Sequence, residues 1–241
     1  MSSRLTSPQG DFSGYQIHPG PAHAILAQTC LGFLLHLDNR IDLKSVEAFP
    51  LAKYAARYWV YHAQFEDVAS RIKDGMETLF DSDKPHFEAW IGIHDIDYSP
   101  RYFWDPEVLP NPNPLYYAAI CGFYDLVEQL AVKHPQHINA ICGKCRFPLL
   151  VALRGYHFEV AELLLEHGAN IDARETTGGT ILLVAMAFTM SHNLVDIVRF
   201  LLEQGADVNA RDGSLRSSLH LVKYDDLEVV QVLLKHNADV N

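Results

Sequence analysis

A leucine recurs at intervals of about 33 residues along the second half of the chain. It stands three residues before a small or apolar residue in four segments, NPLYYA, FPLLVA, TILLVA and SSLHLV. These leucines, Leu115, Leu149, Leu182 and Leu219, are 34, 33 and 37 residues apart. A unit of this length cannot bury its own apolar face. Its recurrence therefore predicts a stack in which neighbouring units cover one another.

Each leucine is followed by a second apolar stripe, which reads LVEQLAV, VAELLLEHGAN, IVRFLLEQGAD or VVQVLLKHNAD. Two stripes joined by a turn predict a pair of helices in each unit, complete four times. The longest interval arises in AMAFTMSHNLVD, where the turn of the third unit is about four residues longer. A surface turn tolerates that length because loop-closure entropy grows slowly.

The segments GANIDAR and GADVNAR resemble the ankyrin-repeat signature, in which a helix ends on glycine and the chain turns into a β-hairpin finger. Gly168 and Gly205 are expected in the left-handed conformation, and Asn237 takes that place in the fourth unit. The resemblance implies an all-α ankyrin solenoid with repeats at about 113–146, 147–179, 180–216 and 217–241, the last one truncated. The family's histidine survives only as His220, so an irregular array is expected.

The first 112 residues predict a small helical domain that precedes the repeats. Residues 1–20 are rich in Ser, Gly and Pro and are expected to form a flexible tail. Helices are expected in residues 21–94, beginning at Pro21, at Pro50 and in FEDVASRIKDGMETLF and PHFEAWIGI. Residues 95–112 contain four prolines and are expected to be a connector. We expect its aromatic residues to pin it onto the helices: Tyr102, Phe103 and Trp104.

Four aromatic residues of the second predicted helix are close in sequence: Tyr54, Tyr58, Trp59 and Tyr61. They are interpreted as core because they follow helical spacing, with a ligand-binding face as the alternative.

The helical segments followed directly by repeats resemble fungal NACHT–ankyrin proteins, members of the STAND class of signalling NTPases. The resemblance rests on AHAILAQTCLGFLLHLD, FPLAKYAARYWVYHAQFEDVASRIKDGMETLF and KPHFEAWI. It implies a helical segment that joins an NTPase to ankyrin repeats. However, the sequence contains no G-x-x-x-x-G-K-[ST], since Gly143 and Lys144 stand without a glycine-rich loop. Nucleotide hydrolysis is therefore not expected of these residues.

Composition and charge narrow the classes of partner. The net charge is −11, and both halves carry more acidic than basic residues, so nucleic-acid binding is disfavoured. No stretch approaches the roughly 20 apolar residues of a membrane span, and the N-terminus does not read as a signal peptide. Four irregularly spaced cysteines do not form a disulfide framework. These observations predict a cytoplasmic protein.

No sequence pattern supports an enzyme, and no catalytic residue, cofactor or metal ligand is predicted. The sharpest alternative is a zinc site at His134-x-x-His137-x-x-x-x-Cys142-x-x-Cys145. Zinc ligand sets usually bracket a longer loop. We therefore interpret these residues as exposed polar positions at the end of a helix and on its finger.

The predicted partner-binding set lies on the fingers and on the inner helices, because stacked repeats expose a long concave surface there. Five basic fingertip residues are expected to contact an acidic partner: Lys144, Arg146, Arg174, Arg211 and Arg216. The alternative is that they only keep the finger edges soluble. The set also includes the neighbouring Glu175 and Asp212, and five inner-helix positions expected to be exposed: Tyr117, Ile120, Val151, Arg154 and Val184.

The predicted function is therefore non-enzymatic protein recognition. The family resemblance implies the sensor or scaffold part of a STAND-type signalling protein, and the alternative is a stand-alone adaptor that brings a substrate to another enzyme. The ending HNADVN carries no terminal capping repeat, so a fragment is expected. The exposed flank of Leu227, Val230 and Leu234 would then permit self-association.

Overall fold

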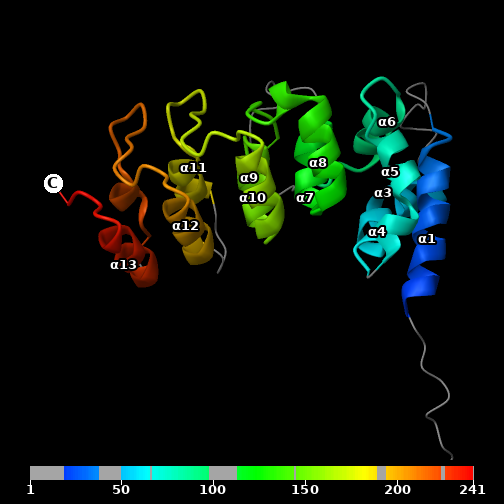
Figure 1. Cartoon of the computed structure of the whole chain (residues 1–241), viewed down its shortest axis with the longest axis horizontal. Helices are drawn as coiled ribbons and strands as arrows, with labels where there is room; N and C mark the ends of the chain where they lie inside the picture. The colour runs from blue at the N-terminus through cyan, green and yellow to red at the C-terminus, as the bar shows by residue number, and fades with distance from the viewer. Residues whose placement is uncertain are drawn as a thin grey trace, which may run out of the picture.

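The computed structural model describes residues 19–37, 50–65, 67–97, 113–143, 145–188, 194–223 and 226–240. Within these ranges the chain is helical, and the only β-type pairing consists of two isolated bridges, Cys142 with Arg146 and Arg174 with Thr180. The helices lie side by side in an elongated row, with the N-terminal helices at one end and α13 at the other (Figure 1). The predicted all-α solenoid is confirmed. None of the described helices is both long and apolar enough to cross a membrane.

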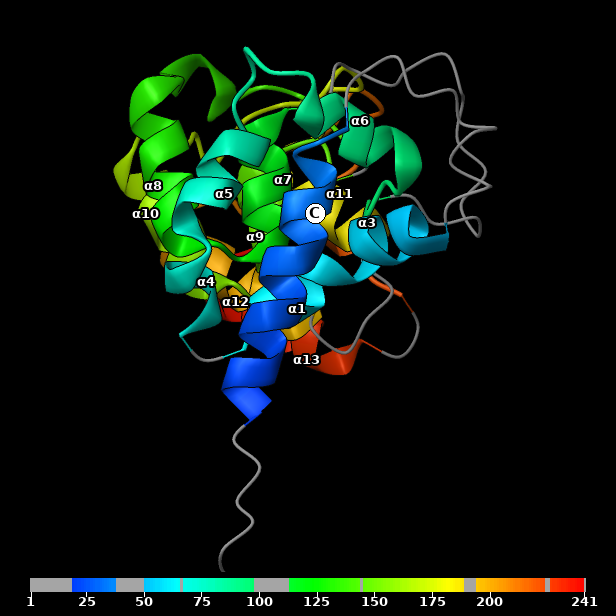
Figure 2. The same ribbon diagram turned by 90° about the vertical axis from the view of Figure 1, so that its right-hand side faces the viewer.

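The helical region comprises α1 (Pro19–Leu34), α3 (Pro50–Ala63), α4 (Val68–Arg71), α5 (Lys73–Leu79) and α6 (His86–Ile93). In the view along the long axis these helices lie together in front of the repeats (Figure 2). They pack around an aromatic core in which the Trp59 and Trp90 ring centroids lie 5.2 Å apart. Trp90 is fully buried and donates its indole N–H to the Ala56 carbonyl at 2.9 Å. That bond satisfies the one polar atom of a large apolar side chain.

Two predicted boundaries differ from the structure. Helix α1 begins at Pro19 rather than Pro21, and the helix predicted in FEDVASRIKDGMETLF is two helices separated at Ile72. The Ile72 backbone has φ −111° and ψ 13°, outside the helical range, which interrupts the segment. Its predicted inward face is nevertheless confirmed by the burial of five residues: Val68, Ile72, Met76, Leu79 and Phe80.

The predicted core face of α3 is wrong for three of its four aromatic residues. Trp59 is buried, but Tyr54, Tyr58 and Tyr61 are between 38% and 56% exposed. Helix α3 instead buries a face of small residues with Trp59 and His62: Ala52, Ala55, Ala56 and Ala63. Small side chains let α1 and α3 approach closely, so the larger rings are placed on the outer side of the pair.

The repeat region follows with α7 (Pro114–Cys121), α8 (Tyr124–Lys133), η2 (Pro135–His137), α9 (Pro148–Arg154), α10 (Phe158–Glu166), α11 (Ile181–Phe188), α12 (Leu194–Glu203), η3 (Ser218–Leu221) and α13 (Leu227–Lys235). The repeating Leu115, Leu149 and Leu182 are at most 1% exposed. They fill the layers between successive helix pairs. The residues of the longer third turn, 189–193, lie outside the described residues, as do the aromatic residues of the connector.

The second helix of each later repeat ends as its sequence predicts. Gly168, Gly205 and Asn237 have φ values of 93°, 92° and 64°. In each case the next residue, an alanine, donates its backbone N–H to the carbonyl five residues back, at 2.8 to 3.0 Å. These bonds satisfy carbonyls that a helix end leaves unpaired, and they turn the chain toward the next finger.

Polar side chains at one recurring position tie each repeat to the next. Asn139 accepts a hydrogen bond from Asn170 N at 2.7 Å and donates to Gly168 O at 3.0 Å. One repeat later, Asp172 accepts from the Asp207 backbone N–H at 3.0 Å. Asn209 repeats the arrangement with the last helix. These contacts form a ladder along the stack and fix the spacing between repeats.

The fourth repeat departs from the predicted helix pair. Its first helix is the 3-10 turn η3, and Leu219 is only half-buried. Ser217 and His220 close this turn with a capping box. Its Ser218 takes the position of Pro148, and its hydroxyl is directed to the Val208 carbonyl at 2.9 Å. The first half of the fourth repeat is therefore a single 3-10 turn held by hydrogen bonds of Ser217 and Ser218.

Candidate interaction surface

The fingers project from one side of the stack as loops between successive helix pairs (Figure 1). Each is closed by a backbone hydrogen bond at the same place: Cys142 N to Arg146 O at 2.7 Å, Glu175 N to Gly179 O at 3.0 Å, and Asp212 N to Arg216 O at 3.1 Å. The shared closure gives the fingers a common orientation. Side chains at equivalent positions therefore recur along one edge.

The arginines on this edge, which we call the finger row, are Arg146, Arg174, Arg211 and Arg216. Two of them join consecutive fingers: Arg146 pairs with Glu175 at 3.3 Å, and Arg174 Nη1 donates to Arg211 O at 2.8 Å. The remaining predicted fingertip residue, Lys144, lies outside the described residues. The finger row therefore links consecutive fingers to one another and also forms a basic edge.

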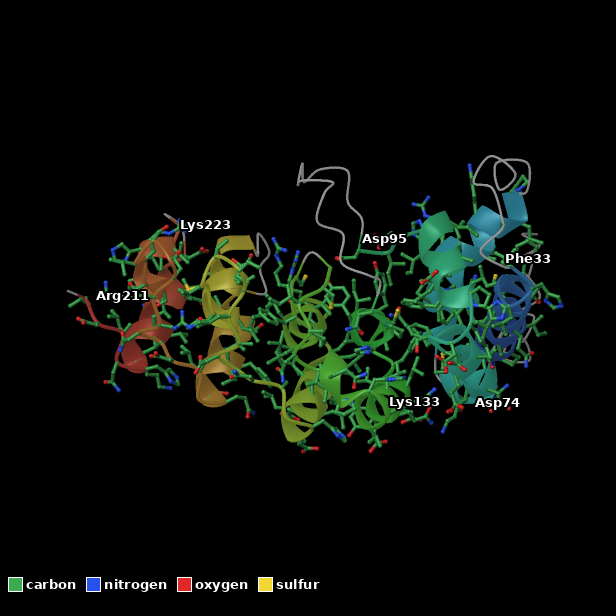
Figure 3. All side chains as sticks on the ribbon, turned by 90° about the horizontal axis from the view of Figure 1, so that it is seen from above. Phe33, Asp74, Asp95, Lys133, Arg211 and Lys223 are labelled. Carbon is green, nitrogen blue, oxygen red and sulfur yellow. The ribbon has the colours of Figure 1, made fainter. Side chains whose placement is uncertain are left out.

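The third finger holds its arginines by local contacts. Arg216 forms a forked pair with Asp212, with Nε and Nη2 at 2.9 and 2.8 Å from Oδ2. The backbone N–H of Arg216 lowers the pKa of the Asp212 carboxyl, which stays ionised at neutral pH. Arg211 Nη1 donates to Leu215 O at 3.3 Å. Both arginines remain exposed, and Figure 3 labels Arg211 near the C-terminal end of the stack.

The two acidic residues predicted to contact a partner have buried side chains, whereas most arginines of the finger row are exposed. The side chains of Glu175 and Asp212 are only 7% and 8% exposed. Each accepts bonds from an arginine of its own or the preceding finger. In the structure these two carboxylates orient Arg146 and Arg216 of the finger row.

Three of the five predicted inner-helix positions are buried, so the expectation that they are exposed is wrong. Tyr117, Val151 and Val184 are 6%, 2% and 2% exposed. Their helices are only seven or eight residues long and are enclosed by neighbouring repeats, so these positions face the stack. Ile120 is half-buried and Arg154 is exposed, which leaves these two as the accessible members of the set.

A polar cluster joins the helical region to the first repeat, which sequence reasoning missed. The Tyr117 hydroxyl donates to Asp95 at 2.8 Å, and the Tyr116 hydroxyl donates to Asp97 at 3.0 Å while accepting from Cys145 N at 3.1 Å. Burial is the main cause that raises the pKa of both tyrosines, so both remain neutral donors. Figure 3 labels Asp95 at this junction. The signal available in the sequence was the pair of adjacent tyrosines, at positions where the other three repeats carry no tyrosine.

Cys142 and Cys145 near this junction are buried free thiols, so their interpretation as exposed positions is wrong. Burial raises the pKa of Cys142 to about 12 and also raises that of Cys145, beside which Arg154 Nη1 lies at 2.8 Å from Sγ. Thiols with raised pKa values are protonated at neutral pH and are poor nucleophiles. Among the described residues, no group of three or more His, Cys, Asp or Glu side chains is arranged to hold a metal ion.

Two exposed apolar residues adopt a backbone conformation that favours glycine. Leu215 has φ 61° and is 71% exposed at the tip of the third finger, where the second finger has Gly178. Tyr156 has φ 62° and is 51% exposed, at the turn where the first repeat has Gly122. Strained, exposed apolar residues are often found where a protein binds a partner. Aligning the repeats against these glycines would have revealed both positions.

The outer helices carry the opposite charge from the fingers. Helices α8 and α10 expose five carboxylates: Asp125, Glu128, Glu159, Glu162 and Glu166. The stack therefore has a basic edge at the fingers and an acidic surface on its outer helices. Such a separation favours one orientation for an approaching acidic surface.

The sequence matches the family described as "Ankyrin repeats (3 copies)" over residues 115–212, and "Ankyrin repeat" over residues 215–241. These matches coincide with the stacked helix pairs and their fingers. The chain therefore belongs to the ankyrin-repeat family, whose repeats serve as protein–protein interaction modules and are generally non-enzymatic.

Similar proteins include azaphilone pigments biosynthesis cluster protein L of the fungus Monascus ruber, 26% identical over 171 residues, which cover 65% of this chain and 36% of the relative. Ankyrin repeat and SAM domain-containing protein 6 of Mus musculus is 32% identical over 53% of this chain and 14% of its own length. Alpha-latrocrustotoxin-Lt1a of Latrodectus tredecimguttatus is 28% identical over 85% of this chain and 15% of its own. The chain thus spans about a third or less of each relative.

Proposed function

We propose that the chain is a non-enzymatic protein-binding module that recognises an acidic partner through the finger row, with Arg154 and Ile120 beside it. The observation that carries this proposal is the set of exposed arginines, Arg174, Arg211 and Arg216, held in place by hydrogen bonds. A side chain already ordered in the free protein loses less entropy on binding. Leu215 adds an exposed apolar contact between Arg211 and Arg216.

The setting we infer is the sensor or scaffold part of a STAND-type signalling protein in the cytoplasm. The fungal relative supports a setting beyond isolated repeats, because its alignment covers more of the chain than residues 113–241 provide. Four free thiols are compatible with a reducing compartment. The alternative is an adaptor that recruits a substrate to another enzyme, which the exposed aromatic face of α3 favours by offering a second surface.

The test is affinity capture from a fungal lysate at low and moderate salt, comparing three proteins. The Arg211→Glu/Arg216→Glu variant reverses the charge of the third finger, and the matched Arg211→Lys/Arg216→Lys variant keeps the charge but loses the forked geometry. A partner retained by the wild type and the lysine variant, but lost with the glutamate variant, supports charge recognition. Equal capture by all three would refute it, provided that circular dichroism shows unchanged folding.

Self-association is a further proposal, supported by the last helix. Leu227 and Leu234 of α13 are 72% and 46% exposed, and Val230 between them is half-buried. Sedimentation at increasing concentration should show oligomers that Leu227→Ser/Leu234→Ser removes. A monomer at every concentration would leave this flank without a role in self-association.

A further inference from the structure

Among the described residues, exposed large apolar side chains are concentrated on α1 and α3. Of the fourteen among the described residues, six lie on α1 and α3: Ile25, Leu26, Leu51, Tyr54, Tyr58 and Tyr61. Scattered exposed apolar residues are ordinary, whereas a concentration marks a contact surface. These helices lie at the end of the molecule opposite α13 (Figure 1).

The α3 members form a single line, which we call the α3 stripe: Leu51, Tyr54, Tyr58 and Tyr61. Their spacing of three, four and three residues places them on one side of the helix. The stripe extends for about 15 Å at 1.5 Å per residue. That is the length that about three turns of a second helix would cover.

Contacts within the protein hold three of these rings in place. The Tyr54 hydroxyl lies 3.0 Å from His62 Nε2, and the Tyr54 and Tyr58 ring centroids are 4.9 Å apart. Tyr61 lies edge-on to the His23 ring of α1 at 5.9 Å. Rigid tyrosines supply contact area at low entropic cost, which is why tyrosine is enriched among residues that dominate binding energy.

The charges beside the stripe select the kind of partner. Helix α1 has no charged residue, and α3 carries Lys53 and Arg57 but no carboxylate, within a chain of net charge −11. Both cations are exposed, and the Arg57 guanidinium lies over the Tyr58 ring at 5.4 Å from its centroid. An apolar line beside two cations complements a surface with apolar and acidic side chains.

We propose that the α3 stripe is a docking site for an amphipathic helix of a partner protein, with apolar residues against Leu51 and Tyr58 and carboxylates against Lys53 and Arg57. Recognition of this type reads apolar anchors at helical spacing. A second copy of this chain fits less well, because pairing α3 with α3 would bring these cations together. The site is separate from the finger row, so it does not depend on recognition by those arginines; it specifies the second surface of the adaptor alternative.

The experiment measures binding of the full chain to a fluorescent synthetic helical peptide of about 15 residues, with leucines on one face and glutamates beside them. A second peptide replaces every glutamate with lysine. We expect the glutamate peptide to bind and Leu51→Ser/Tyr58→Ala to weaken it at least about tenfold. The matched control is Val132→Ser/Tyr124→Ala on α8, which removes equally exposed apolar residues and should leave binding unchanged.

Reversing the charges beside the α3 stripe tests the charge preference directly. Lys53→Glu/Arg57→Glu should reverse the preference, so that the lysine peptide binds more tightly than the glutamate peptide. Arg211→Glu/Arg216→Glu should have no effect, which separates this site from the finger row. Equal affinity for both peptides, or no binding of the glutamate peptide up to about 1 mM, would overturn the proposal. So would sedimentation showing a dimer that Leu51→Ser dissociates, since a second copy would then occupy the stripe.

Discussion

The helical region and the repeats are both built from short helices, but they are held together in different ways. In the helical region Trp59, Trp90 and Phe80 meet in one cluster, with ring centroids 5.2 to 6.3 Å apart. In the repeats, leucine layers alternate with hydrogen bonds such as that from Asn170 N to Asn139. One aromatic cluster makes its region a single unit, whereas a stack distributes stability between neighbours.

The largest effect is expected from Trp90→Ala. This fully buried ring touches Trp59, Phe87 and Tyr117. Its loss should cost about 3–5 kcal/mol of unfolding free energy. Hydrogen exchange should show lost protection across the helical region and α7, with α13 little changed. Leu201→Ala in α12 is the control, since its loss of protection should be confined to adjacent repeats. Local losses for Trp90→Ala and widespread losses for Leu201→Ala would contradict the comparison.

The next effect is expected where a finger meets the first repeat. A Cβ on Gly143 would lie 2.3 Å from the Tyr116 ring, and its φ is 58°. Gly143→Ala should therefore cost about 2–3 kcal/mol through overpacking and backbone strain. At Gly168, where φ is 93° and nothing lies within 4 Å, alanine should cost only about 1 kcal/mol. If urea unfolding shows the same loss of unfolding free energy for both variants, the Tyr116 ring must move aside to accommodate the new Cβ.

The junction between the two regions should respond to a smaller change. Tyr116→Phe removes the bond to Asp97 and leaves Cys145 N without its acceptor. We expect a loss of about 1–2 kcal/mol. If the two regions unfold together in the wild type, the variant should separate their transitions in a calorimetric scan. A scan that keeps one transition would show that the aromatic contacts alone couple the regions.

Acid should weaken the structure through one buried histidine, His62, and three half-buried ones. Burial is the main cause that lowers the pKa of all four: His62, His94, His137 and His157. Below about pH 6.5 the unfolded chain then binds more protons than the folded chain. The contribution of these histidines to the unfolding free energy should therefore be constant above that pH and decrease as the pH falls below it.

Helix α1 meets α3 at one of these histidines, since His23 Nδ1 and His62 Nδ1 lie 2.7 Å apart, within hydrogen-bonding distance. In urea midpoints between about pH 5.5 and 8, His62→Gln should flatten the slope. The matched control changes a histidine on the surface, the exposed His36, to Gln. A slope identical in all three proteins would exclude His62 as a contributor.

The smallest effect has the opposite sign. Leu215→Gly relieves a left-handed leucine and should raise the unfolding free energy by about 1 kcal/mol. If Leu215 is a binding anchor, the same change should weaken capture of the partner. If Leu215→Gly is more stable and captures the partner as well as the wild type, Leu215 has no role in binding. Tyr156→Gly provides the comparison at a position outside the finger row.

Local sequence signals were sufficient for the helix pairs and their ends. The spacing of Leu115, Leu149 and Leu182 specified the layers, and Gly168 and Gly205 specified the left-handed turns. These features depend on residues close in the chain. The arginines of the finger row were also found, because a repeat places equivalent residues along one edge.

The sequence by itself determined that this chain would stack as ankyrin repeats, since periodic apolar residues and glycines act locally. Only the tertiary structure decided which face of α3 is buried, because that depends on how closely α1 approaches its alanines. It also buried Tyr117 against Trp90 and joined it to Asp95, far from it in the chain. Helical periodicity identifies faces, but packing between distant segments chooses which face meets a partner.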